Sequence, residues 1–240
     1  MVPGACRNLE IEDVNIMSRV CTGDGIDIVG CEDVTLRDSF IRASDDCVCI
    51  KAASYPDPAA NRNVKNILVE HCVLWNAEPG NAVEIGYEVR CDEISDITFR
   101  DLDIVHCQYE GNQSGGVLTI HNADRAYIHN IVYEDIRVED AQEKFIDIKV
   151  LDSKYSLDRS RGRVEDIFFR NIEILNGNFP VSIVRGFEMH TEMSRPQNIH
   201  FDNVVVLGEQ INSPSDLHMV VELSNDIWFN GKDRVKRNPF

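Results

Sequence analysis

A short alternation of polar and apolar residues recurs along the chain. Each unit begins with Asn or Asp and continues with apolar residues at alternate positions, the spacing that puts one set of side chains on one face of a β-strand. The units begin at Asn8, Asp33, Asn66, Asp96, Asn130, Asp166 and Asn198. From Leu9 to Ile199, their first apolar residues are 25, 33, 30, 34, 36 and 32 positions apart. The chain therefore contains an internal repeat of roughly thirty residues.

A second series of short segments lies between these units, and its members are rich in Val and Ile, which favour strands. They are Gly25–Ile28, Cys47–Ile50, Ala82–Ile85, Leu118–Ile120, Phe145–Ile148, Val181–Val184 and His218–Val221. Each repeat thus supplies at least two strands. No segment of about 12 residues keeps an uninterrupted helical period.

Strands of one kind that recur without helical crossovers can stack in register as parallel sheets, so that each coil covers the next. The pattern predicts an all-β fold, a single-stranded right-handed parallel β-helix of about seven coils. The alternative is a β-sandwich, which favours tight hairpin turns, such as Asn-Gly, every 8–12 residues. The turns of this chain do not alternate in that way.

We expect one β-helix domain over residues 1–240. Two polar segments, 52–63 and 152–162, interrupt the repeat and are expected to be loops between strands and not domain linkers. From residue 211 the pattern weakens, and 211–240 is expected to be a terminal cap or tail, with the basic residues of 232–237 in solvent.

The first motif with candidate chemistry begins at Thr22, which leaves room for barely one coil before it. That coil would leave an apolar end and open strand edges, which terminal caps normally cover. We therefore expect that N-terminal coils are missing, and that the chain self-associates through this exposed N-terminal end.

The amino-acid composition limits the classes of molecule that the chain is expected to bind. The net charge of −17 argues against nucleic acid, which needs a basic surface, and suits a neutral or cationic ligand. No apolar run approaches the ~18 residues of a membrane helix. The N-terminus has neither the basic nor the apolar region of a signal peptide, which favours the cytoplasm for the chain as it stands. With N-terminal coils missing, an extracellular or periplasmic protein is the alternative.

The eight cysteines form no Cys-x-x-Cys pair, so we expect reduced, buried thiols and no zinc.

The outward positions of the second series carry the candidate chemistry. If Ile26 and Ile28 point inward, then Asp27 points outward. By register its column continues with Cys49, Glu84, Thr119 and Asp147, and the next column holds Lys51, Gly86, His121 and Lys149. Asp24 and the pair Asp45-Asp46 come directly before two of these strands. Because one coil step is about 4.8 Å, carboxylates on adjacent coils reach the same sugar unit.

Paired carboxylates have a well-defined chemistry. Like charges held close together raise at least one carboxyl pKa, which leaves one protonated acid beside one ionised base. Hydrolysis of a glycosidic bond needs that pair: an acid for the leaving oxygen and a base for water. A single Asp in a β-helix turn more often satisfies backbone groups there. Two acidic motifs on successive coils, 21 residues apart from Asp24 to Asp45, favour the catalytic interpretation.

Two motifs carry a family resemblance. Thr22-Gly23-Asp24-Gly25-Ile26-Asp27, followed by Ser44-Asp45-Asp46-Cys47-Val48-Cys49-Ile50-Lys51, resembles the polygalacturonase-like glycoside hydrolases, and the likeness extends to about residue 205. The resemblance implies that Asp45 is the general acid, and that Asp24 and Asp46 hold and deprotonate the attacking water. It implies inversion at the anomeric carbon and no metal or organic cofactor. Lys51 is expected to brace the carboxylates or touch substrate.

The departures from the family pattern concern specificity. The Gly-His-Gly of the family is replaced by Gly80-Asn81-Ala82, and its Arg-Ile-Lys, whose cations grip a galacturonate carboxylate, aligns with Thr119-Ile120-His121. Glu84 adds a negative charge nearby. A carboxylate subsite would be poorly stabilised there, so a neutral sugar is expected. The expected substrate-binding residues are Asp27, Lys51, Glu84, Thr119 and His121.

Three functions stay open at this stage. The first is an inverting glycosidase acting on a plant or microbial polysaccharide or oligosaccharide, not specific for galacturonate. The second is a noncatalytic β-helix that binds polysaccharide. The third is a polysaccharide lyase, which normally uses calcium and a Lys or Arg base; Lys51 and Lys149 keep it open. The sugar, the linkage, and endo or exo action are not encoded in any of these motifs.

Overall fold

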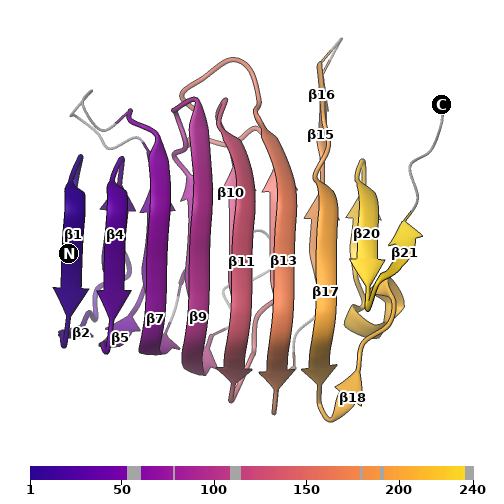
Figure 1. Cartoon of the computed structure of the whole chain (residues 1–240), viewed down its shortest axis with the longest axis horizontal. Coiled ribbons are helices and arrows are strands. Elements are labelled where there is room, and N and C mark those ends of the chain that lie inside the picture. The colour runs from indigo at the N-terminus through magenta and orange to yellow at the C-terminus, as the bar shows by residue number, and fades with distance from the viewer. Residues whose placement is uncertain (53–60, 78, 109–114, 179–180, 190–191, 236–240) are drawn as a thin grey trace.

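A computed structural model describes residues 1–52, 61–77, 79–108, 115–178, 181–189 and 192–235. The coils stack along one axis, and their strands lie side by side from β1 at one end to β20 at the other (Figure 1). Most of the loop expected at 52–63 lies outside the described residues.

The larger sheet has twelve strands, and its main path is β1-β4-β7-β9-β11-β13-β17-β20-β21, with β2, β5 and β18 beside it. Every pairing along the path is parallel up to β20, whereas β21 and β18 pair antiparallel. Its strands are β1 (Arg7–Glu12), β2 (Asn15–Met17), β4 (Glu32–Arg37), β5 (Phe40–Ala43), β7 (Val64–Asn76), β9 (Glu93–Cys107), β11 (Tyr127–Val138), β13 (Arg163–Ile174), β17 (Gln197–Val206), β18 (Glu209–Gln210), β20 (Asn225–Phe229) and β21 (Lys232–Val235).

The smaller sheet has seven strands in the order β19-β14-β12-β10-β8-β6-β3, all parallel. They are β3 (Ile26–Val29), β6 (Val48–Lys51), β8 (Val83–Tyr87), β10 (Leu118–Asn122), β12 (Ile146–Val150), β14 (Ile183–Arg185) and β19 (Val220–Glu222). A two-stranded antiparallel sheet, β15 (Phe187–Met189) with β16 (Glu192–Ser194), and one short 3-10 helix, η2 (Pro214–Leu217), complete the described elements.

The polar residue that opens each repeat has a backbone role. These residues all have φ between 53° and 57°, the left-handed region that Asn and Asp tolerate best among residues with a Cβ. They are Asn8, Asp33, Asn66, Asp96, Asn130, Asp166 and Asn198. Their side chains also bond from coil to coil, as from Asn66 Nδ2 to Asp33 Oδ1 at 2.6 Å. The repeat seen in the sequence is therefore a repeated bend of the chain.

The core is a set of ladders, one rung per coil. Phe99, Tyr133, Phe169, Phe201 and Phe229 stack face to face with ring centroids 4.8 to 5.0 Å apart, close to the spacing of stacked strands. Ile and Val fill the other inward positions of both sheets. Burial of these ladders against neighbouring coils supplies the hydrophobic stabilisation of the fold.

The predicted fold class is confirmed: the chain is a right-handed parallel β-helix. The number of full turns, about five, differs slightly from the predicted seven. Among the described strands of the larger sheet, β7, β9, β11, β13 and β17 are the longest. At the N-terminal end, pairs of short strands take their place, and residues 211–235 add β19, β20 and a final antiparallel strand.

Candidate active site

The two acidic turns predicted from sequence lie next to each other. The turn with Asp24 leads into β3, and the turn with Asp45 and Asp46 leads into β6, which pairs with β3 in parallel. Two backbone hydrogen bonds join the turns, from Asp45 N to Gly23 O at 3.4 Å and from Gly25 N to Asp46 O at 2.8 Å. The three carboxylates are thereby brought onto adjacent coils.

Glycine permits this close packing. A Cβ on Gly80 would lie 2.5 Å from the carbonyl carbon of Asp45, and Gly80 also has a φ of +106°. Any larger residue there would displace the turn that carries Asp45. Asn76 fixes the same turn from the other side, because its Nδ2 donates to Asp45 O at 3.0 Å.

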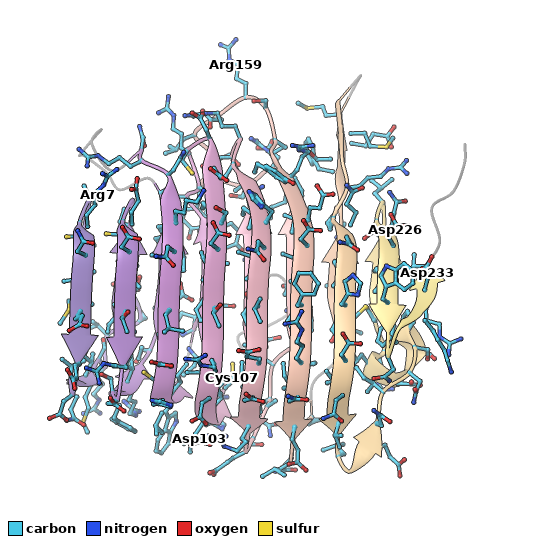
Figure 2. The ribbon with its side chains drawn as sticks, in the orientation of Figure 1. Arg7, Asp103, Cys107, Arg159, Asp226 and Asp233 are labelled. Atoms are coloured by element: carbon cyan, nitrogen blue, oxygen red, sulfur yellow. The ribbon has the colours of Figure 1, made fainter. Side chains whose placement is uncertain are left out.

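These turns open onto a cleft of about 990 Å³. The three aspartates share its wall with Lys51, Asn81 and Glu84. The loop after β12 supplies the opposite wall, and the charged tip of that loop, with Arg159, rises above the upper ends of the strands (Figure 2). The full lining is Cys21, Thr22, Asp24, Asp45, Asp46, Lys51, Pro79, Gly80, Asn81, Glu84, Gly86, Tyr87, Glu88, Leu151, Ser153, Lys154 and Tyr155.

Lys51 braces two carboxylates at one end of the cleft. Its Nζ lies 3.2 Å from Asp24 Oδ2 and 3.1 Å from Asp27 Oδ2. Asp27 is buried, and that burial raises the pKa of its carboxyl to about 7; Lys51 opposes the rise and the charge of Asp24 adds to it. Asp27 does not line the cleft, so the structure places it behind Asp24.

Asp46 is bound to its neighbours through one amide. Asn81 donates its backbone N–H at 3.0 Å and its Nδ2 at 2.6 Å to Asp46 Oδ1, and the same Nδ2 donates to Glu84 Oε2 at 2.9 Å. Burial raises the pKa of Asp46 well above its ordinary value, and the nearby charge of Glu84 adds to the rise. Both causes favour the protonated form of the Asp46 carboxyl beside the cleft.

The first outward column exists as predicted, in the register Asp27–Cys49–Glu84–Thr119–Asp147. The second continues from Gly86 through His121 to Lys149, whereas Lys51 pairs with Val29 and the pairing of β6 with β8 ends at Ile50. Their exposure differs from the expectation. Thr119 and His121 have no exposed surface. The ring of Tyr87 stacks on His121 at 4.4 Å, and Tyr155 packs on Tyr87 at 5.3 Å. The expectation that both residues face the ligand therefore needs correction, because both are buried. Aromatic side chains, which periodicity does not encode, cover His121, and Thr119 is bonded to Asn81.

Thr119 and His121 instead support the residues in front of them. Thr119 Oγ1 donates to Asn81 Oδ1 at 2.8 Å, and His121 Nδ1 lies 2.8 Å from Glu84 Oε1. Burial by itself would raise the pKa of Glu84, but the hydrogen bond and the charge of His121 hold it below its ordinary value.

The residues of the wall that sequence reasoning missed include Tyr87, Glu88 and Tyr155. Tyr87 ends β8 two positions after the inward Ile85, so strict alternation would point it inward and could not have revealed it as a cleft residue. Tyr155 belongs to the segment identified only as a loop, where no periodicity indicates direction.

Metal binding has one candidate among the described residues. Ligand atoms of Asp46, Cys49 and Glu84 lie within 4.8 Å of one another. The group is already bonded internally, because Asn81 donates to both carboxylates and the Cys49 thiol donates to Gly86 O at 3.2 Å. It is therefore a hydrogen-bonded cluster, and nothing in its geometry selects a cation.

All eight cysteines are free thiols, and six of them are buried. Among the residues that the structure describes, no helix is long and apolar enough to cross a membrane.

The fold and the site together define a parallel β-solenoid protein with a carboxylate-lined cleft. The sequence model of the glycosyl hydrolases of family 28 matches residues 2–213, and the chain belongs to that family. Among solved structures, it is similar to the family 28 exopolygalacturonase of Yersinia enterocolitica, with 13% identity and a TM-score of 0.44. The match covers 88% of this chain and 39% of that enzyme, so this chain spans well under half of its length. No curated protein sequence matches the chain.

Proposed function

We propose that the chain is a glycoside hydrolase that cleaves a polysaccharide or oligosaccharide. The observation that carries the proposal is the meeting of Asp24, Asp45 and Asp46, from two adjacent coils, on the wall of one cleft. Membership of glycosyl hydrolase family 28 supports it.

The proposed mechanism inverts the anomeric carbon. Asp45 donates a proton to the leaving oxygen, while Asp24 and Asp46 hold and deprotonate the attacking water. Asp24 is ion-paired with Lys51, whereas Asp46 is buried beside the anionic Glu84. The two aspartates therefore have different roles, since Asp24 accepts the proton of the water and Asp46 orients that water through a hydrogen bond.

The proposed substrate is a neutral sugar and not galacturonate. Five carboxylates and two lysines lie among the described residues that line the cleft. Lys51 is held by Asp24 and Asp27, and Lys154 Nζ lies 4.8 Å from the centre of the Tyr155 ring. A uronate carboxylate would enter a negatively charged cleft with no dedicated guanidinium, which costs binding free energy.

A glycan hydrolysis screen tests the activity and the specificity together. It should cover pectic, galactosyl, rhamnosyl and glucan substrates, with the anomer of the first product read by proton NMR. We expect reducing ends from a neutral glycan, an inverted anomer, and poor release from polygalacturonic acid. Efficient galacturonate release would refute the specificity, and a 4,5-unsaturated product would identify a lyase instead.

Three variants test the roles of the acids. Asp45→Asn and Asp24→Asn should each lower kcat by ~10²–10⁴ while leaving the fold intact. Asp92→Asn is the matched control, because the Asp92 side chain is 84% exposed and lies outside the cleft lining. Wild-type turnover in both active-site variants would refute the assignment. Glycan binding retained by Asp45→Asn would separate catalysis from a purely binding module.

Self-association is a separate part of the proposal. β1 pairs with β4 on one side, and no other described strand pairs with its outer edge. An open strand edge is a template for a second chain. Light scattering should therefore show dimers at high protein concentration, and a stable monomer under those conditions would count against the idea.

A further inference from the structure

A line of buried polar groups runs from the cleft into the stack behind it. Asn81 links Asp46 to Glu84, with hydrogen bonds of 2.6 and 2.9 Å. Glu84 Oε1 lies 2.8 Å from His121 Nδ1, and His121 Nε2 lies 3.4 Å from Asp147 Oδ2. The line thus crosses three neighbouring strands, β8, β10 and β12.

The strand register fixes this geometry. Glu84 pairs with Thr119, and Thr119 with Asp147, so the two carboxylates occupy equivalent places on either side of β10. His121 lies two residues further along β10, between Gly86 and Lys149. It has no exposed surface, and Tyr87 closes the space above its ring.

The charge states of the buried groups along this line follow from their contacts with one another. His121 Nδ1 lies within hydrogen-bond distance of Glu84, whereas its Nε2 lies 3.4 Å from Asp147 Oδ2 and has no hydrogen-bond partner among the described residues; two carboxylates this close favour the cationic imidazole by charge. Burial by itself lowers the pKa of His121, but Asp147 and Glu84 outweigh it and raise that pKa above its ordinary value. Asp147 has further cations nearby, Lys149 Nζ at 2.8 Å and Lys144 Nζ at 3.7 Å.

These contacts determine which of two neighbouring carboxyls carries a proton. Asp46 and Glu84 share one amide, and both are buried, so they compete for protonation. His121 stabilises the anion on the Glu84 side; Lys51 lowers the pKa of both carboxyls, and the charge of Asp45 raises that of Asp46. Of these two carboxyls, both of which line the cleft, the contacts favour Asp46 as the one that holds the proton.

We propose that His121 is a positioning residue: clamped between Glu84 and Asp147, it holds Glu84 as an anion and so keeps the proton of the pair on Asp46. This inference rests on the proposed function for its catalytic meaning, since a neutral Asp46 orients water and leaves Asp24 as the base. The arrangement itself is a property of the folded chain and can be measured without a substrate.

The first experiment titrates the side chains by NMR, with ¹³C-labelled Asp, Glu and His in the full chain, assigned through single substitutions. In the wild type, His121 should stay cationic through neutral pH while Asp46 stays protonated. Glu84→Gln removes the neighbouring anion and should lower the pH at which Asp46 titrates by at least one unit, a tenfold change in proton affinity. An unchanged Asp46 titration in Glu84→Gln would overturn the proposal.

The second experiment separates the charge of His121 from its ring. His121→Phe keeps a ring under Tyr87 but no charge, so Glu84 should titrate at higher pH and take over the proton. His121→Lys keeps a cation and should preserve the wild-type pattern. If His121→Phe fails to fold, the Glu84→Gln and His121→Lys titrations still decide the question.

Kinetics on a cleaved glycan provide the catalytic readout. His121→Phe should lower kcat at least tenfold with little change in KM, and His121→Lys should restore most of that loss. His129→Gln is the matched control, because it removes a His–Glu pair (2.9 Å to Glu93) on the other sheet and should leave kcat unchanged. Wild-type kcat in His121→Phe would refute the positioning role. If no glycan is cleaved by the wild type while the titrations move as expected, the proposed function fails and the proton-directing contact stands.

Discussion

Asp27 gives the most quantitative prediction, because its burial couples stability to pH. Its carboxyl titrates near 7 in the folded chain, whereas an unfolded Asp titrates near 3.9. Between those values the folded state binds more protons than the unfolded state. The free energy of unfolding therefore falls as pH rises through this window. Replacing Asp27 with Asn removes the titrating group and with it this contribution.

The size of the effect follows from the two pKa values. The reference is a carboxyl that stays protonated in both the folded and the unfolded state. Compared with it, Asp27 lowers the free energy of unfolding by about 4 kcal/mol at pH 7.5 and by about 1 kcal/mol at pH 4.5. The free energy of unfolding of Asp27→Asn, relative to wild type, should thus rise by about 3 kcal/mol between pH 4.5 and pH 7.5. Loss of the bond to Lys51 offsets part of the gain at pH 7.5, but only the difference between the two pH values enters the prediction.

Urea unfolding of both proteins at pH 4.5 and 7.5, followed by circular dichroism, measures this difference. Other titrating groups, Asp46 among them, are common to both proteins and cancel to first order. A relative stability that is equal at the two pH values, or that favours the variant more at pH 4.5, would refute the reasoning. Lys51→Met offers an independent check, since loss of the cation should move the Asp27 titration to still higher pH.

Three further predictions concern side chains described above. Tyr133→Phe should raise the free energy of unfolding by about 1–3 kcal/mol, because Tyr133 Oη is buried with no hydrogen-bond partner among the described residues; thermal unfolding measures it. Phe169→Ala should lower that free energy by about 3–5 kcal/mol, since the ring stacks between Tyr133 at 4.9 Å and Phe201 at 4.8 Å, and a change below 1 kcal/mol would contradict the ladder. Tyr155→Ala should raise KM about fivefold with kcat retained, because the half-exposed ring offers a stacking surface for sugar; an unchanged KM would exclude that contact.

The fold was predictable because the repeat marks the same backbone position in every coil. Asn8, Asp33 and Asn66 recur since the chain needs a left-handed residue there, and the alternation after them fixes which side chains point inward. The register of the first outward column followed directly. The number of full turns did not follow, because a motif shows that a strand exists but not how much of the sheet it spans.

The candidate site was predictable only in part. Asp24, Asp45 and Asp46 stand in sequence motifs, and adjacent coils bring them together. The burial of His121 depends on Tyr87 and on a loop whose path has no period. Asn81 was noted only as a departure from a family pattern, whereas in the structure it is the amide that joins Asp46 to Glu84.

The alternation along each strand separates residues that stabilise the fold from residues that are free to serve function. Inward positions hold the stack together, and some outward positions line the cleft, so selection can alter one set while the other stays constant. A duplicated segment of roughly thirty residues would lengthen the cleft by about 4.8 Å and add a rung to every ladder, with no new kind of contact. Such a protein lengthens by whole coils, and the number of coils sets the length of a polymeric glycan that the cleft can contact.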